Sequence, residues 1–218
     1  MRAQLSQYGM TTAKQIEPPN PDSSEHEAQL IRRALEIFQT ADWSGPESPA
    51  DLVELKKITS SGQTGAARAA LDVAIKYGFP HGGWCPKGRK SEDGPIDRQY
   101  HLIETPSRNY LQRTDWNVRD SDGTVIFTAE KNVAGRLLRV TESASENDKP
   151  FIHISFLANE NPHSAIKRFV AEHRIRVLNV AGSRASKEPD IWAKVYSFLE
   201  KTFFGEFANK PVNPPSAL

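Results

Sequence analysis

The sequence predicts an α/β fold, namely a Rossmann-like three-layer sandwich with a mainly parallel sheet and helices on both faces. From Lys57 onward, short apolar runs alternate with segments whose apolar residues repeat at helical spacing. Strands separated by helices imply a parallel sheet, because right-handed crossovers return the chain to the same end of the sheet. The chain has 218 residues, a length that suits one such domain with additional terminal segments.

Residues 1–56 precede this alternation. Residues 1–28 are polar and contain the run "EPPNPDSSEHE", which predicts a disordered or loosely packed leader. Residues 29–56 are predicted to be an N-terminal helical extension, because they contain a helical apolar face and a second helix start at Ser48-Pro49. That apolar face consists of Leu30, Ile31, Ala34, Leu35, Ile37 and Phe38. The Rossmann-like ligand-binding domain is expected over 57–206, followed by a flexible proline-rich tail over 207–218.

Within the domain, the elements are expected in the following order along the chain. Continuous apolar runs predict strands at 57–60, 124–129, 150–157 and 175–182, with a weaker one near 79–84. Helical periodicity predicts helices at 65–78, 107–120, 161–174 and 188–204. Residues 135–148 are expected to form a further crossover, whose Ser and Thr content lowers its helix propensity. Residues 80–96 show no periodicity and are expected to form a long loop.

Composition argues against several classes of protein. The formal net charge of +1 and the pI near 7.9 argue against nucleic-acid binding, which a strongly basic face would indicate. The single cysteine, Cys85, cannot form an internal disulfide or a cysteine zinc cluster, and it suits a reducing, cytoplasmic location. His153, His163 and His173 do not have metal-ligand spacing, so no metal site is expected. No apolar run is long enough for a membrane span, and the first residues do not resemble a secretory signal.

Ligands of parallel α/β sheets bind at the carboxyl ends of the strands, so the loops at those ends are the candidate site. The first loop, "SSGQTG", precedes a helix, whose free N–H groups and partial positive charge favour an anion. A turn that only starts the helix remains an equal alternative. The candidate residues here are Ser61, Gly62, Gln63, Thr64, Gly65 and Arg68.

The segment "PHGGWCPKGRKSEDGPI" is the second candidate. Trp84 offers a flat face for stacking on a ring, and Lys87 offers a cation for phosphate. Gly82 and Gly83 would let a ligand approach the backbone closely. The alternative is a surface loop with solvated charges.

Two further regions supply candidates. Asp120, Ser121 and Asp122 precede a predicted strand and are either a ligand-binding group or a turn before a strand. The last strand-loop-helix unit is a second possible anion site or, equally, a capped helix start with exposed charges. Its candidate residues are Gly182, Ser183, Arg184 and Lys187.

Three blocks occur in an order that resembles the molybdenum cofactor carrier family. They are "SGQTGAARAALDVAIKYGFPHGGWCPKGRKSEDGPI", "ETPSRNYLQRTDWNVRDSDGTVIF" and "IRVLNVAGSRASKEPDI". This family is similar to a circularly permuted branch of the lysine-decarboxylase-like, DprA-related Rossmannoid proteins, which bind nucleotide-like ligands. The resemblance covers about residues 57–204. It implies a homo-oligomer, dimer or tetramer, that carries or stores the molybdenum cofactor (molybdopterin), a phosphorylated pterin–molybdenum ligand, for a molybdoenzyme or cofactor-synthesis protein, without transforming it.

The sequence departs from the family pattern at three places. Ser61 replaces a glycine of the first loop, Ala67 stands where an aspartate is usual, and Gly135-Arg136 replaces a Gly-Gly-Thr turn. The resemblance thereby adds Gly135 and Arg136, in the loop after the "TVIF" strand, to the candidate site residues. Losing an acid and gaining an arginine makes the expected pocket more cationic. Two alternatives are a nucleotide-binding enzyme of the related group, with Glu142 as its acid, and a sensor of a nucleotide-derived phosphorylated ligand.

Overall fold

The computed structural model describes residues 55–205. The predicted leader, nearly all of the predicted helical extension and the predicted tail lie outside these residues. Among the described residues, no helix is long and apolar enough to cross a membrane.

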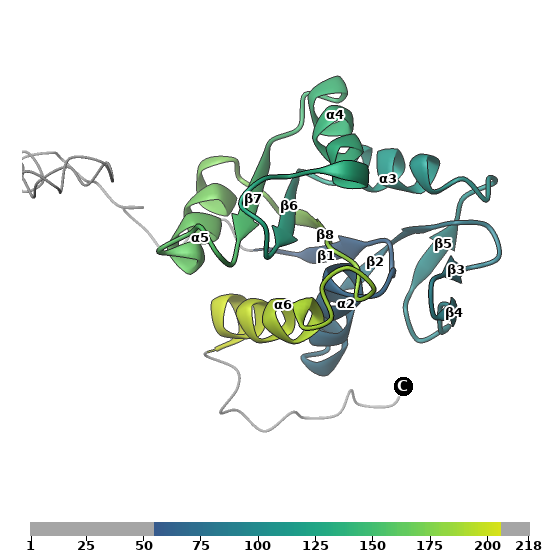
Figure 1. The fold of residues 1–218 in the computed structure, drawn as a ribbon, viewed down its shortest axis with the longest axis horizontal. Coiled ribbons are helices and arrows are strands. Elements are labelled where there is room, and N and C mark those ends of the chain that lie inside the picture. The colour runs from purple at the N-terminus through teal and green to yellow at the C-terminus, as the bar shows by residue number, and fades with distance from the viewer. Residues whose placement is uncertain (1–54, 206–218) are drawn as a thin grey trace, which may run out of the picture. The chain divides into compact units, whose positions relative to one another are not determined.

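A six-stranded sheet with the order β5-β2-β1-β8-β6-β7 forms the centre of the described domain (Figure 1). Every strand pair in this sheet is parallel. The strands are β1 (Lys57–Ser60), β2 (His81–Cys85), β5 (Leu102–Glu104), β6 (Gly123–Thr128), β7 (Phe151–Ser155) and β8 (Val177–Gly182). The predicted fold class, a mainly parallel sheet with helices on both faces, is confirmed.

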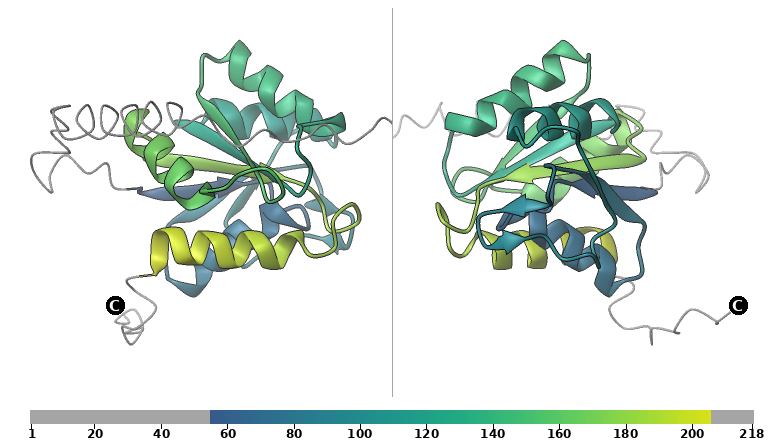
Figure 2. Two further views of the ribbon diagram at one scale, coloured as in Figure 1. Left: turned by 60° about the vertical axis from the view of Figure 1, so that its left-hand side comes forward. Right: turned by 90° about the vertical axis from the view of Figure 1, so that its right-hand side faces the viewer.

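Helices cover both faces of the sheet (Figure 2). One apolar cluster joins the first face to α2 (Ala66–Lys76), α5 (Pro162–Glu172) and α6 (Ile191–Leu199). A second cluster joins the opposite face to α3 (Tyr110–Arg119) and α4 (Leu138–Glu146). A 3₁₀ turn (Gly135–Leu137) leads into α4, and a π-helical turn (Glu200–Phe204) follows α6.

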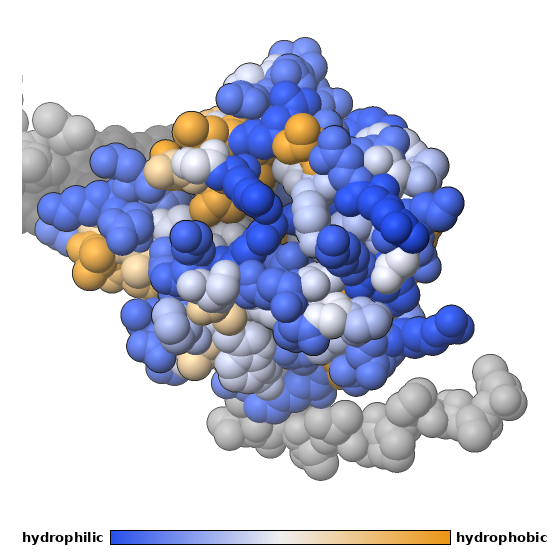
Figure 3. Space-filling view, turned by 45° about the vertical axis from the view of Figure 1, so that its right-hand side comes forward, coloured by the Kyte–Doolittle hydropathy of each residue, from blue (hydrophilic) through white to orange (hydrophobic). Residues whose placement is uncertain are grey.

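The central strands are buried on both faces, which explains their continuous apolar sequences. Val125 and Phe127 of β6 pack into the α2/α5/α6 cluster, whereas Ile126 packs into the α3/α4 cluster. All three side chains are fully buried. Side chains alternate along a strand, so Asn179 and Ala181 of β8 share the α3/α4 face, opposite Leu178 and Val180. The face of the domain shown in Figure 3 is mostly hydrophilic, with apolar residues in small separate patches.

The prediction of one long loop over residues 80–96 is wrong. This segment contains β2 and a short antiparallel hairpin of β3 (Lys90–Ser91) and β4 (Gly94–Pro95). The strand was hard to predict because "HGGWC" contains two glycines, which have low strand propensity. Tertiary packing selects glycine here: a Cβ atom on Gly83 would lie 2.2 Å from the Ser60 carbonyl oxygen.

Candidate functional site

A crevice lies where neighbouring strands send the chain to opposite faces of the sheet. The chain leaves β8 toward α6, on one face, and leaves the adjacent β6 toward α4, on the other (Figure 2). Such a switch point is the usual ligand-binding place of a parallel α/β sheet. The first loop, after β1, reaches the same edge because β1 pairs with β8.

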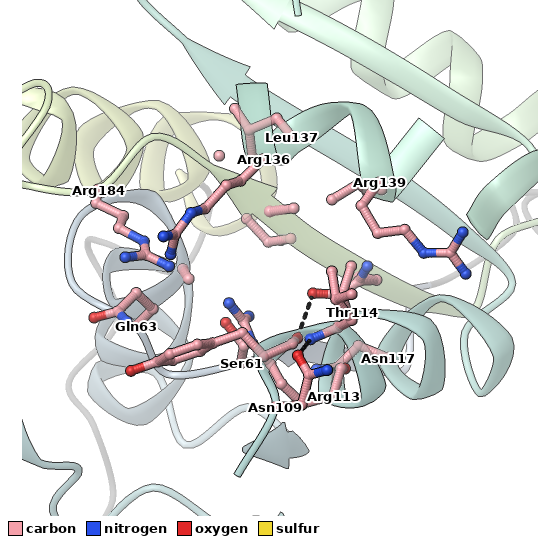
Figure 4. Close-up of a pocket in the computed structure, with 18 residues that line it drawn as sticks. Ser61, Gln63, Asn109, Arg113, Thr114, Asn117, Arg136, Leu137, Arg139 and Arg184 are labelled. Atoms are coloured by element: carbon pink, nitrogen blue, oxygen red, sulfur yellow. Dashed lines mark hydrogen bonds between the residues drawn. The ribbon is translucent and has the colours of Figure 1, made fainter. Parts of the chain in front are cut away.

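A pocket of about 330 Å³ occupies this place, a volume at the lower end of the range for small-molecule sites. Its walls come from the β1–α2 loop, the first two turns of α3, residues 136–140, and the end of β8 with the loop that follows (Figure 4). Helix α3 begins beside it because the Asn109 side chain caps its N-terminus, accepting a hydrogen bond from the Leu111 N–H at 3.0 Å.

The pocket is lined by four arginines, Arg113, Arg136, Arg139 and Arg184, and by no described Asp or Glu. The Arg139 guanidinium is neutralised by Asp115 at 2.9 Å and Glu146 at 2.8 Å, and it points away from Arg136 and Arg184 (Figure 4). No described residue forms a hydrogen bond or ion pair with the Arg136 side chain. The pocket therefore holds uncompensated positive charge.

Arg113 and Arg184 approach the same aromatic ring. Their guanidinium carbons lie 5.7 Å and 5.4 Å from the centre of the Tyr110 ring. Burial, together with the positive charge of Arg184, lowers the pKa of Arg113 to about 10. The Arg113 Nε atom is buried and has no hydrogen-bond partner among the described residues. A bound anion would relieve both the repulsion and the missing hydrogen bond.

The first loop contributes side chains to the pocket, but some of its backbone donors are used within the protein. The Ala66 N–H donates to the Ser183 carbonyl at 3.1 Å, and the Thr64 N–H donates to Gln63 Oε1 at 3.0 Å. Gln63 Oε1 also accepts from the Glu92 N–H at 3.0 Å, which leaves the Gln63 Nε2 as the group able to donate to a ligand. Ala67 lines the pocket where the family pattern has an aspartate, so the site lacks that carboxylate.

The structure brings five predicted site residues together at the pocket. They are Ser61, Gln63, Arg136, Gly182 and Arg184. Five other candidates belong to the loops that form its walls without themselves lining it: Gly62, Thr64, Gly65, Gly135 and Ser183. Lys187 follows Arg184 in the last loop but is exposed.

The remaining candidates lie elsewhere. The Arg68 side chain points to the β3–β4 hairpin, Gly82 and Gly83 lie inside β2, and Lys87 is exposed. Ser121 and Asp122 precede β6 and so lie at the amino edge of the sheet, where the Asp122 carboxylate accepts hydrogen bonds from the Arg176 and Val177 N–H groups. Glu142 of the alternative enzyme hypothesis is exposed, pairs with Arg139 at 3.6 Å and does not line the pocket.

Trp84 and Asp120 line a second, smaller cavity of about 170 Å³. The Trp84 indole N–H donates to Asp120 at 2.7 Å, and the Asp120 carboxylate also pairs with Arg119 at 2.7 Å. Asn117 lies between the two cavities, and its amide is fully used: it accepts from the Trp84 N–H and donates to the Trp84 and Arg113 carbonyls, each at 2.8 Å. Asn117 thus ties α3 to β2.

Sequence reasoning missed several lining residues, including Asn109, Tyr110, Arg113 and Asn117. Arg113 and Asn117 lie in the block "RTDWNVRDSDGT", so this part of the family resemblance could have indicated them.

The pocket offers guanidinium, amide and hydroxyl donors. No group of three or more His, Cys, Asp or Glu residues in the described part of the chain is placed to hold a metal ion. Burial raises the pKa of the Cys85 thiol, which keeps it protonated.

The fold and the pocket together define a Rossmann-like domain with an arginine-lined pocket at the switch point of its sheet. A model of the circularly permuted YpsA SLOG family matches residues 58–203, and the chain belongs to this family. It is also similar to a crystal structure from Syntrophus aciditrophicus described as a putative molybdenum carrier protein. That protein is 41% identical, the match covers 69% of this chain and 95% of that chain, and the TM-score is 0.66. No curated protein matches the chain.

Replacement of Asp120 by Asn is expected to change acid stability but not anion binding. The Arg119 side chain lowers the pKa of the Asp120 carboxyl despite partial burial, and the Trp84 hydrogen bond contributes. A carboxyl with a lowered pKa stabilises the fold above its ordinary pKa, and this contribution disappears as pH falls through the lowered value. The urea midpoint of D120N should therefore fall less steeply than that of the wild type below about pH 4. An equally steep fall would contradict this assignment.

Proposed function

We propose that this protein is a carrier or storage protein that binds the molybdenum cofactor, a phosphorylated pterin–molybdenum ligand, in the arginine-lined pocket. The observation that carries the proposal is the convergence of Arg113, Arg136 and Arg184 on one pocket that no Asp or Glu among residues 55–205 lines. Guanidinium groups bind phosphate and oxo groups strongly because their hydrogen bonds are charge-assisted and can be bidentate. The 41% identity to a protein described as a putative molybdenum carrier supports the choice of this ligand.

The donor set of the pocket fits this cargo. The cofactor carries its metal on its own dithiolene sulfurs, so the protein needs no cluster of metal-ligating side chains, and none is placed in the described residues. The buried Arg113 Nε has no acceptor among the described residues, and a phosphate or oxo oxygen would supply one. Asn179 donates its amide N–H to Thr124 at 3.1 Å, and its Oδ1 offers an acceptor for the polar edge of a heterocycle.

The proposal includes release of the cofactor to a molybdoenzyme or a cofactor-synthesis protein, from a homo-oligomer that is a dimer or a tetramer. The assembly is testable by sedimentation of the full chain. A deletion of residues 1–45 then shows whether the apolar face at Leu30–Phe38 covers the interface. A strictly monomeric full chain would remove the assembly from the proposal and leave the binding site intact.

Equilibrium dialysis of the full chain against isolated molybdenum cofactor tests the ligand. We expect saturable binding at micromolar protein, with metal and pterin retained together. AMP and inorganic molybdate serve as comparators: a preference for AMP would favour a nucleotide-derived ligand, and retention of molybdate alone would mean that the oxoanion is sufficient. Absence of saturable cofactor binding would refute the proposal.

A further inference from the structure

The β3–β4 hairpin lies beside the pocket without lining it. Its turn contains Glu92 and Asp93, the first two residues of the block "EDGPI". The Glu92 side chain is 23% exposed, and its carboxylate accepts hydrogen bonds from two different loops. Hydrogen bonds to a charged carboxylate are stronger than those between neutral groups. The donors to Glu92 come from the β1–α2 loop and from the β8–α6 loop.

Glu92 bridges the two loops that carry the pocket residues Gln63 and Arg184. From the β1–α2 loop, its Oε1 accepts from the Thr64 hydroxyl, and its own backbone N–H donates to Gln63 at 3.0 Å. From the β8–α6 loop, it accepts from the Ser186 N–H at 3.1 Å and from the Ser186 hydroxyl at 2.8 Å. One side chain therefore bridges both loops, in addition to the direct hydrogen bond from the Ala66 N–H to the Ser183 carbonyl.

A second set of contacts anchors the hairpin itself. The Arg68 guanidinium pairs with Asp93 at 3.2 Å and donates from Nε to the Gly62 carbonyl at 2.8 Å. Ile96, directly after the hairpin, packs against Gly62, where a Cβ atom would lie 3.2 Å from its side chain. These contacts hold the hairpin against the β1–α2 loop. From this position Glu92 contacts the β8–α6 loop.

Glu92 orients Arg184 without neutralising it. The Arg184 Nη1 lies 4.0 Å from the Glu92 carboxylate, the outer limit of an ion pair. At that distance the guanidinium is drawn toward the hairpin but keeps its donors free for a ligand. The same carboxylate accepts hydrogen bonds from the Thr64 hydroxyl and from the Ser186 N–H and hydroxyl.

We infer that Glu92 is a positioning residue, which locks the β1–α2 and β8–α6 loops together and so places Gln63 and Arg184 for the anion. It holds the loops through hydrogen bonds and does not contact the ligand. The effect on affinity rests on the proposed function of the pocket, whereas the locking of the loops is independent of any ligand.

Three variants of the full chain test this inference. Glu92→Ala removes the bridge, and Glu92→Gln keeps an acceptor for Ser186 and Thr64 without the charge. Glu160→Ala is the control, because Glu160 is an exposed carboxylate for which the described residues provide no hydrogen bond or ion pair. Hydrogen exchange of residues 61–66 and 183–187 is measured without ligand, and affinity is measured with isolated molybdenum cofactor as the probe.

In E92A, we expect amide exchange in both loops to accelerate about tenfold or more and cofactor affinity to fall about tenfold, the usual scale for a lost charge-assisted hydrogen bond. E92Q should recover most of both losses, and E160A should match the wild type. Unchanged exchange in either loop of E92A, or equal losses in E92Q and E92A, would overturn the inference. If the wild type binds no cofactor, the proposed function fails, and the exchange data alone decide the role of Glu92.

Discussion

Replacing both Arg136 and Arg184 with alanine is expected to weaken binding of the isolated molybdenum cofactor by at least about 100-fold. Each hydrogen bond to a charged group contributes roughly 1.5–3 kcal/mol when it is shielded from water, and about 1.4 kcal/mol corresponds to a factor of ten in affinity. The two guanidinium groups lie close together on one side of the pocket and have little competition from carboxylates (Figure 4). Their joint loss removes much of the positive charge that the pocket offers.

The control for this prediction removes the same charge elsewhere. Arg168 and Arg174 are exposed, lie in or just after α5, and do not line the pocket. The double variant R168A/R174A has the same net charge as R136A/R184A but should bind within about twofold of the wild type, because exposed charges are screened by salt. Titration calorimetry or equilibrium dialysis distinguishes the pair. Equal losses in the two double variants would mean that net charge, and not this pocket, attracts the ligand.

Gly65→Ala is expected to destabilise the fold by about 3 kcal/mol or more, the sum of a strained backbone and an overpacked contact. Gly65 has φ = 78° and ψ = −135°, a conformation that side chains rarely adopt. A Cβ atom there would lie 2.4 Å from the Ser183 carbonyl oxygen and 2.9 Å from the Ala185 nitrogen. Both are backbone atoms of the loop that carries Arg184, so the clash cannot be relieved by rotating a side chain.

Gly78→Ala is the matched control. Gly78 also has a positive φ of 59°, but a Cβ atom there would meet nothing within 4 Å. Its substitution should therefore cost only the backbone strain, about 1 kcal/mol. Urea unfolding of both variants at pH 7 measures the difference. If G65A is no less stable than G78A, the close packing of the two pocket loops is not as the structure describes it.

The sequence predicted the parts of the fold that are buried on both faces. Strands β6 and β8 have mainly apolar runs because helices cover both of their sides. Strand β2 was predicted only weakly because Gly82 and Gly83 give it few side chains to bury, and β5, an edge strand of three residues, was not predicted. The glycines of β2 are selected by the backbone that they approach, and this long-range contact is not visible in the local sequence.

The site residues that could be predicted are those placed by the position of their loop at the carboxyl edge of the sheet. Arg136 and Arg184 follow strands at the carboxyl edge, so the rule for parallel sheets located them. Asp122 precedes β6 and therefore lies at the opposite edge, where it binds backbone N–H groups of the β8 entry. Arg113 was missed because tertiary packing places α3 beside the pocket: Val118 packs against α4, and Asn117 holds the Trp84 backbone of β2.

A crystal structure of the full chain with isolated molybdenum cofactor tests the central claim most directly. The proposal predicts that the phosphate or oxo oxygens of the ligand contact Arg136 and Arg184, with Arg113 Nε donating to the same ligand. Ligand density in the Trp84–Asp120 cavity, or at any place that none of the three arginines touches, would contradict it.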